Sequence, residues 1–227
     1  MALERALSKL GLASRKDARR LIGGGLVAVN GRVVSNPLAA VVPERDAITV
    51  SGAPAPPRLW RTIAFHKPRG CVTTRRDPQG RTTVFDVLGE AGAGLLAVGR
   101  LDLASSGLLL LTTDTQLAEW LTNPTNAVIR RYVVTVRGHV GDDDLKVLRA
   151  GIAGLRAASV TIRKRSNRET HLIVELTEGK NREIRRLFAA VGREVTRLLR
   201  VAYGPIELGA LQPGRWRELS AADFARR

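Results

Sequence analysis

The chain has 227 residues and a formal net charge of +16, because 37 lysines and arginines outnumber 21 aspartates and glutamates. An apolar fraction of 44% is enough for a real core, and this length suits one large domain or a medium and a small one. No apolar run approaches the roughly 20 residues of a membrane span, and a single cysteine excludes an intramolecular disulfide framework.

The basic excess suits a phosphate-rich partner. An acidic membrane surface would also attract cations, but no basic amphipathic helix with large aromatic residues stands out, so we expect no membrane partner. The first residues lead straight into a helical pattern, so we expect no signal peptide and a cytoplasmic protein. The three histidines are too scattered for a metal site, and no phosphate-loop motif follows Gly23-Gly24-Gly25. The sequence therefore predicts no cofactor.

The N-terminal part predicts a helix with one strongly basic face. Ser14 is a candidate N-cap, since Asp17 stands three residues later and an apolar stripe follows. The cations off that stripe are Arg15, Lys16, Arg19 and Arg20. Asn30-Gly31 lies between two apolar runs and is the strongest two-residue hairpin signal, and residues 48–50 would complete a small sheet. Spacing alone leaves open whether the basic face binds a partner or is merely solvated.

This region closely resembles the S4 RNA-binding domain over roughly residues 2–51. The similarity rests on Ser14-Arg15-Lys16-Asp17-Ala18 and Val27-Ala28-Val29-Asn30-Gly31. It implies that the basic helix face contacts RNA. The proline-rich stretch that follows predicts a stiff linker. We therefore expect an S4-like domain at residues 1–52, a linker at 53–60 and a second domain at 61–227.

The second domain is organised around residues 98–114. Its four consecutive leucines, Leu108 to Leu111, cannot alternate faces and predict a strand buried on both sides. Asp102 precedes them in a loop, with a leucine on either side, where a carboxylate is costly unless a cation or several donors meet it. Spacing alone favours a structural role, in which Asp102 caps the loop by accepting backbone hydrogen bonds.

Two further segments carry candidate site residues. Residues 131–136 alternate as a strand, in which a tyrosine with valine neighbours such as Tyr132 is ordinarily a core residue. A helical stripe that begins at Ile184 leaves Arg185 bordering the apolar face. Arg185 is therefore the arginine of that segment placed to meet a half-buried carboxylate, although spacing alone favours an ordinary surface arginine.

Together these segments resemble the RsuA/RluB-type ribosomal RNA pseudouridine synthases over nearly the whole chain. The motifs that carry the similarity are Gly99-Arg100-Leu101-Asp102, Arg131-Tyr132, the basic helix start at 178–188 and the closing strand at 195–204. The resemblance implies that Asp102 is the catalytic residue, that Tyr132 stacks on the target uracil and that Arg185 pairs with Asp102. It also implies that Leu198 packs beside the active site. The cations expected to contact RNA near the cleft are Lys67, Arg69, Arg81 and Arg100.

The same resemblance implies an α+β fold, in which a mixed, largely antiparallel sheet flanked by helices follows the small S4-like α/β domain. The implied reaction isomerises a uridine of ribosomal RNA to pseudouridine without a cofactor. The implied partner is ribosomal RNA or a ribosome assembly intermediate, bound by a monomer. Residues 181–187 and 200–204 look more like the large-subunit type of enzyme than the small-subunit type.

Two other interpretations stay open at this point: the same reaction on small-subunit RNA, and a non-enzymatic ribosome-assembly factor that binds RNA through the S4 domain. A hydrolase that cleaves the base outright is disfavoured, because the sequence shows no second catalytic carboxylate.

Overall fold

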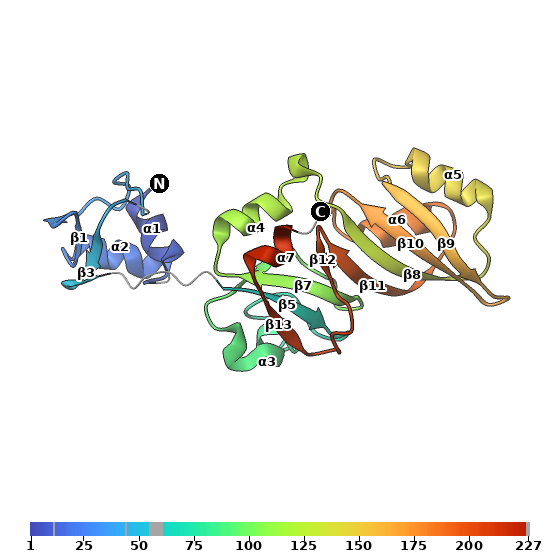
Figure 1. Cartoon of the computed structure of the whole chain (residues 1–227), viewed down its shortest axis with the longest axis horizontal. Coiled ribbons are helices and arrows are strands. Elements are labelled where there is room, and N and C mark those ends of the chain that lie inside the picture. Colours follow the sequence, from blue (N-terminus) through green and yellow to red (C-terminus); the bar gives the residue numbers. More distant parts are fainter. Residues whose placement is uncertain (11, 44, 55–60, 226–227) are drawn as a thin grey trace. The chain divides into compact units, whose positions relative to one another are not determined.

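The structure of the chain is a computed structural model, which describes residues 1–10, 12–43, 45–54 and 61–225. Contacts within the chain divide it into two compact units, residues 1–60 and 61–227 (Figure 1). In the part of the chain that the structure describes, no helix is long and apolar enough to cross a membrane.

The first unit packs two helices against a small antiparallel sheet with the strand order β2-β1-β3-β4. Its elements are α1 (Leu3–Lys9), α2 (Arg15–Gly23), β1 (Val27–Val29), β2 (Arg32–Val33), β3 (Ile48–Val50) and β4 (Ala53–Pro54). The predicted N-cap is confirmed, because the Ser14 hydroxyl accepts a hydrogen bond from Asp17 N. Asn30 and Gly31 both have positive φ, at 50° and 78°, as a two-residue hairpin turn requires.

The predicted linker begins too early. Ala53 and Pro54 form β4, which pairs with β3 at the edge of the sheet, where a proline is tolerated. Ser51 and Gly52 supply the turn between the two strands, again with positive φ. The rest of the predicted linker, residues 55–60, lies outside the described residues.

The second unit contains a larger sheet and most of the helices. Its strands are β5 (Thr62–Lys67), β6 (Leu96–Val98), β7 (Ser106–Thr112), β8 (Arg130–Arg137), β9 (Ser159–Arg165), β10 (Glu169–Leu176), β11 (Val195–Tyr203), β12 (Ile206–Glu207) and β13 (Trp216–Leu219). Its helices are α3 (Val84–Leu88), α4 (Thr115–Thr122), α5 (Asp142–Ala150), α6 (Glu183–Ala190) and α7 (Ala221–Ala225), with short 3₁₀ turns η1 (Gly89–Gly92) and η2 (Pro124–Asn126).

The described strands of this unit form one sheet with the order β13-β5-β7-β11-β8-β10-β9, while β12 and β6 pair with β11 and β7 off that path. Among these pairs, β7 and β11 run parallel and the others antiparallel. The sheet is therefore mixed and largely antiparallel, as the sequence predicted. β7 and β11 pair with each other in the middle of this strand order. The loops that precede and follow these two strands therefore lie near the middle of the sheet (Figure 1).

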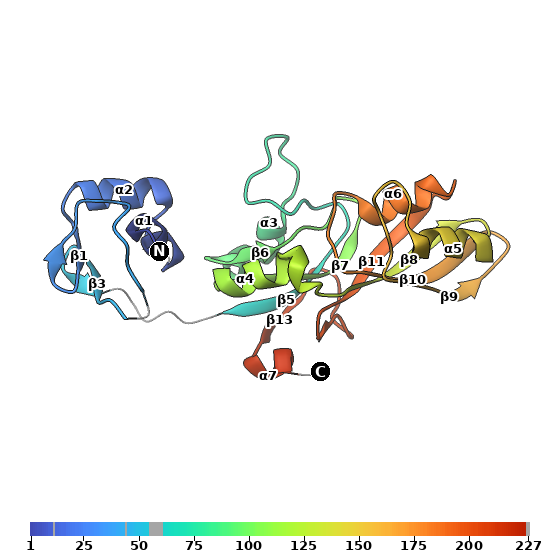
Figure 2. The ribbon, with the colours of Figure 1, turned by 90° about the horizontal axis from the view of Figure 1, so that it is seen from above.

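The leucine strand β7 is buried on both faces, as predicted. Leu109 and Leu111 belong to one core cluster and Leu108 and Leu110 to another, and all four are fully buried. The first cluster includes apolar residues of α3, α5 and α6, and the second includes residues of α4 and α7. Figure 2 shows α3 and α6 on one side of the strands and α7 on the other. Both faces of the sheet are thus covered near β7.

Candidate active site

The loop between β6 and β7 carries Asp102, and its main chain is held at several points. Ser105 N donates to Asp102 O, and Gly70 N donates to Leu103 O. The Thr73 hydroxyl donates to Leu101 O at 2.9 Å and lies 3.2 Å from Leu101 N, which donates to it. The Asp102 backbone is therefore fixed by contacts from a neighbouring loop.

Lys67 completes this support, which corrects its predicted role as an RNA contact. The side chain of Lys67 has no exposed surface. Its Nζ donates hydrogen bonds to the carbonyl oxygens of Pro68, Asp102 and Ser105 at 3.1, 3.1 and 2.9 Å. Burial lowers the pKa of this ammonium group, while the thiol of Cys71 and the Asp102 carboxylate favour its charged form. Lys67 thus holds the Asp102 loop from inside the protein and has no exposed surface with which to contact RNA.

The Asp102 carboxylate itself is left open. It is half-buried, and it makes no hydrogen bond or ion pair with any residue that the structure describes. The interpretation of Asp102 as a loop cap is therefore wrong: Asp102 O takes part in the loop contacts, but the side chain does not. A fixed backbone that presents an unpartnered carboxylate suits a group that acts on a ligand.

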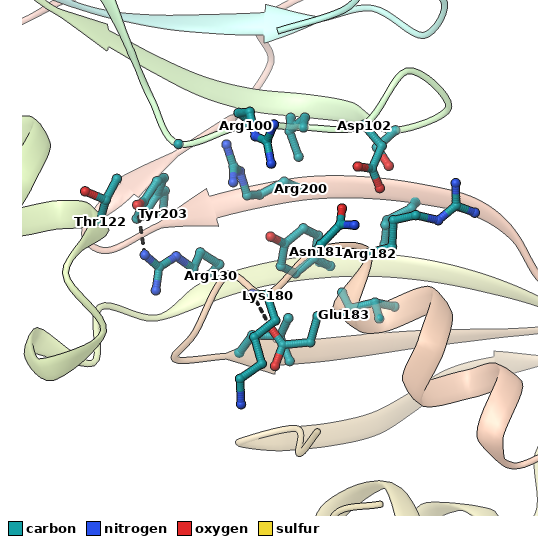
Figure 3. Close-up of a pocket in the computed structure, with 18 residues that line it drawn as sticks. Arg100, Asp102, Thr122, Arg130, Lys180, Asn181, Arg182, Glu183, Arg200 and Tyr203 are labelled. Atoms are coloured by element: carbon teal, nitrogen blue, oxygen red, sulfur yellow. Dashed lines mark hydrogen bonds between the residues drawn. The ribbon is translucent and has the colours of Figure 1, made fainter. Parts of the chain in front are cut away.

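Asp102 faces a pocket of about 220 Å³ between its loop, the sheet and the N-terminal end of α6 (Figure 3). Tyr132 of β8 and Leu198 of β11, the two residues that the family resemblance places at an active site, line the same pocket. Arg200 also lines it and lies directly opposite Tyr132 in the β8–β11 ladder. The carboxylate, the tyrosine and the leucine are therefore brought together from three separate strands or loops.

The pocket contains two tyrosines in different states. The Tyr203 hydroxyl donates to Leu121 O at 2.9 Å and accepts from Arg130 at 3.0 Å. The Tyr132 ring is 8% exposed, and its hydroxyl has no hydrogen-bond partner within the described residues. Tyr132 packs in the apolar core, but unlike the hydroxyl of Tyr203 its hydroxyl is not tied to a backbone group, which leaves the hydroxyl open to a ligand.

Arg185 lies near Asp102 but does not form the predicted ion pair, since no nitrogen of Arg185 lies within 4.0 Å of the Asp102 carboxylate. Its guanidinium donates instead to Val195 O at 2.7 Å and to Ala104 O, in the Asp102 loop, at 3.4 Å. Burial lowers the pKa of Arg185, as does the positive charge of Arg182, while Asp102 raises it. Arg185 therefore bridges the Asp102 loop to β11 and acts on the carboxylate at longer range.

The sequence analysis missed three buried charged residues of the pocket: Arg130, Glu183 and Arg200. Glu183 begins α6 and accepts a hydrogen bond from Lys180 N, and its burial raises the pKa of its carboxyl group. Arg130 donates to several backbone carbonyls. Strand alternation would have indicated Arg200, because it lies two residues after Leu198 on the same face.

The remaining predicted RNA contacts lie at the surface. In the second unit, Arg69, Arg81 and Arg100 are exposed, and of these Arg100 lines the pocket. Arg81 is paired with Asp77, and its hydrogen bonds lower the pKa of that carboxyl group to about 2. In the first unit, Arg15, Lys16, Arg19 and Arg20 are exposed on α2, and Arg19 pairs with Glu4. Among the described residues, no cluster of three or more His, Cys, Asp or Glu side chains suits a metal ion.

Comparison with known proteins identifies the family of the chain. A family model described as RNA pseudouridylate synthase matches residues 61–190, and an S4 domain model matches residues 3–41. The chain belongs to the RNA pseudouridine synthase family. This synthase is 40% identical to "Ribosomal large subunit pseudouridine synthase B" of Escherichia coli (strain K12), over 97% of its own length and 79% of the relative's. The same name is given to a Yersinia pestis relative that is 40% identical, over 96% and 72% of the two chains.

A further relative and a solved structure agree with this assignment. An "Uncharacterized RNA pseudouridine synthase" of Aquifex aeolicus (strain VF5) is 36% identical, over 98% of the synthase and 92% of the relative. A crystal structure of a pseudouridylate synthase matches the fold with a TM-score of 0.68 at 24% identity, over 100% of the synthase and 99% of that chain. The predicted family, S4 domain and α+β fold are confirmed, and the chain is an RNA pseudouridine synthase.

Proposed function

We propose that this synthase isomerises a uridine of large-subunit ribosomal RNA to pseudouridine, with Asp102 as its catalytic residue. The observation that carries the proposal is the unpartnered Asp102 carboxylate, held on a fixed loop at a pocket that also contains Tyr132 and Leu198. The printed names of the Escherichia coli and Yersinia pestis relatives support the large subunit as the source of the substrate.

The reaction breaks the bond between N1 of uracil and C1′ of the ribose, turns the base, and joins C5 to C1′. The proton on C5 leaves and a proton ends on N1, so no atom or electron is gained or lost overall. The target uridine must leave its base stack to enter the pocket, which costs a few kcal/mol. Contacts between cationic side chains and the RNA backbone offset this cost.

Four residues at or near the pocket have a role in this scheme. Asp102 acts on the ribose or the base, since its carboxylate is open to a bound nucleotide. Tyr132 stacks on the uracil through its ring, and its free hydroxyl is available to assist in moving the C5 proton. Leu198 packs beside the base, and Arg185 keeps the Asp102 loop attached to β11.

The two units divide the work. We propose that the first unit binds RNA as an S4-like domain through the basic face of α2, and that residues 61–227 carry out the chemistry. The S4 match at residues 3–41 and the compactness of each unit support this division. We propose that the synthase acts as a monomer in the cytoplasm, on ribosomal RNA or an assembly intermediate, and its net charge of +16 supports a phosphate-rich partner.

The decisive experiment incubates the purified synthase with large-subunit and small-subunit ribosomal RNA from cells that lack the gene, and then maps pseudouridine chemically in both. We expect one new pseudouridine in large-subunit RNA. Modification of small-subunit RNA alone would overturn the choice of subunit. RNA binding with no modification of either RNA, alone or in assembly intermediates, would favour the assembly factor.

A further inference from the structure

Arg200 holds a donor that the folded protein leaves unused. It lies on β11 with only 3% of its surface exposed, and its Nε donates to Leu108 O at 2.7 Å. Its Nη2 is buried and has no hydrogen-bond partner among the residues that the structure describes. Leaving a buried donor of a charged group without an acceptor costs free energy of folding. A bound ligand that supplies the acceptor would remove this cost, so the unpaired donor indicates a ligand site.

The charge of Arg200 is also uncompensated. Its guanidinium lies 5.0 Å from the centre of the Tyr203 ring, and no carboxylate of the described residues lies within ion-pair distance. In Figure 3 the exposed side chain of Arg100 points toward Arg200, and both arginines line the same pocket. Arg100 has no hydrogen bond or ion pair with any described residue either, so its side chain is free to move aside for a ligand.

A second arginine of the same pocket shows the contrast. Both terminal nitrogens of Arg130 are engaged, by the carbonyls of Val128 and Thr177 and by Leu121 O and the Tyr203 hydroxyl. Arg130 therefore has a structural explanation within the protein. In Arg200, the Nε has a partner within the described part of the protein, whereas the Nη2 has none.

We propose that Arg200, with Arg100 beside it, binds a non-bridging oxygen of an RNA backbone phosphate next to the target uridine and so positions that nucleotide. Paired guanidinium groups suit a phosphate, which is the anionic part of a nucleotide. Arg200 lies directly opposite Tyr132 in the ladder, so a base held at Tyr132 brings its own backbone close to Arg200. The inference rests on the proposed site around Asp102, but not on which ribosomal RNA is the substrate.

The test combines a variant with a chemically altered substrate. A short RNA that the wild-type enzyme isomerises is made with a neutral methylphosphonate in place of each phosphate that flanks the target uridine. We compare the wild type, Arg200→Met and Arg197→Met. Arg197 is a matched control, because it is an exposed arginine on the same strand and does not line the pocket.

We expect one of the methylphosphonates to lower kcat/KM of the wild type about 10- to 100-fold, as for the loss of a charge-assisted hydrogen bond. Arg200→Met should lose a similar factor on unmodified RNA, and the methylphosphonate should lower its kcat/KM much less than that of the wild type, because only the contact with Arg100 is left to lose. Arg197→Met should respond like the wild type. Arg200→Met removes an unsatisfied buried donor but also takes the Nε donor from Leu108 O, so its melting temperature should fall only modestly. Arg200→Lys, which retains the charge, should recover part of the activity.

Additive losses from Arg200→Met and the methylphosphonate would overturn the inference, as would unchanged kcat/KM in Arg200→Met. If Arg200→Met does not fold, the wild-type measurement decides: no sensitivity at either flanking phosphate would also overturn it. A wild-type enzyme that isomerises no ribosomal RNA would refute the proposed function instead, before any variant is measured.

Discussion

Replacing Lys67 with methionine tests whether this buried lysine holds the Asp102 loop. Methionine fills much of the same volume but cannot donate to the carbonyls of Pro68, Asp102 and Ser105. Asp102 O keeps the hydrogen bond from Ser105 N, so two carbonyls lose their main donor. At about 1 kcal/mol for each unpaired buried acceptor, and with partial relief from removing a desolvated ammonium, we expect a loss of about 1–2 kcal/mol in the free energy of unfolding.

The effect on turnover should be larger than the effect on stability. A shift of the loop by about 1 Å misplaces the Asp102 carboxylate and costs on the order of 100-fold in kcat. KM for RNA should change little, because Lys67 has no exposed surface with which to contact RNA. Denaturant unfolding can be followed by the fluorescence of Trp120 and Trp216, which both lie in the second unit.

The control is Arg69→Met, which removes an exposed cation from the same segment. This variant should unfold like the wild type and should affect mainly KM. A Lys67→Met protein that retains wild-type kcat would refute the assignment of loop support to Lys67, whatever its stability.

Three further predictions concern Tyr132, the basic face of α2 and the ion pair between Asp77 and Arg81. Tyr132→Phe should bind RNA nearly normally, because its ring still stacks on the base, whereas Tyr132→Ala should lose about 1–3 kcal/mol of binding free energy, measured by titration. Full activity in both variants would show that Tyr132 is only a core residue. A variant with alanine at three exposed cations of α2, Arg15, Lys16 and Arg20, should bind RNA with a weaker salt dependence. The slope of log affinity against log salt concentration should flatten by roughly 0.7–0.9 for each lost phosphate contact. An unchanged slope would mean that this face is merely solvated. The pKa of Asp77 is lowered to about 2, so its stabilising effect is complete above the ordinary value of 3.8 and is lost as the pH falls toward 2. The melting temperature of the wild type should therefore exceed that of Asp77→Asn at pH 5, with a difference that shrinks by pH 2; a difference independent of pH would contradict this.

Patterns that depend on burial were readable from the sequence. The leucine run predicted β7 because a strand buried on both faces needs apolar residues at every position. The alternation at residues 131–136 predicted β8, and the Asn30-Gly31 signal predicted the hairpin of the first unit. In contrast, β13 has no alternating pattern because its residues are largely exposed, and it is defined by backbone pairing with β5.

Some members of the pocket, such as Asp102 and Tyr132, were predictable from the sequence, but its buried charged residues and most of its contacts were not. The helical stripe placed Arg185 on the correct side of α6, yet the guanidinium reaches carbonyls rather than the carboxylate. Lys67 was expected at the surface because a lysine at a strand end beside a turn-rich loop usually is. Its burial depends on three carbonyls from two loops, and no local pattern encodes that arrangement.

Asp102 is the residue that we propose acts on the uridine. The most direct measurement is release of tritium from RNA labelled at C5 of uracil, because the C5 proton must leave when C5 joins the ribose. The comparison is between Asp102→Asn and a matched control, Glu183→Gln. Glu183 is the other carboxylate of the pocket, and the amide oxygen of glutamine can still accept the hydrogen bond from Lys180 N.

We expect Asp102→Asn to bind RNA with an affinity close to that of the wild type and to release no tritium in a single-turnover experiment. Glu183→Gln should fold and release tritium. Wild-type tritium release by Asp102→Asn, or its loss in Glu183→Gln alone, would contradict the assignment of catalysis to Asp102.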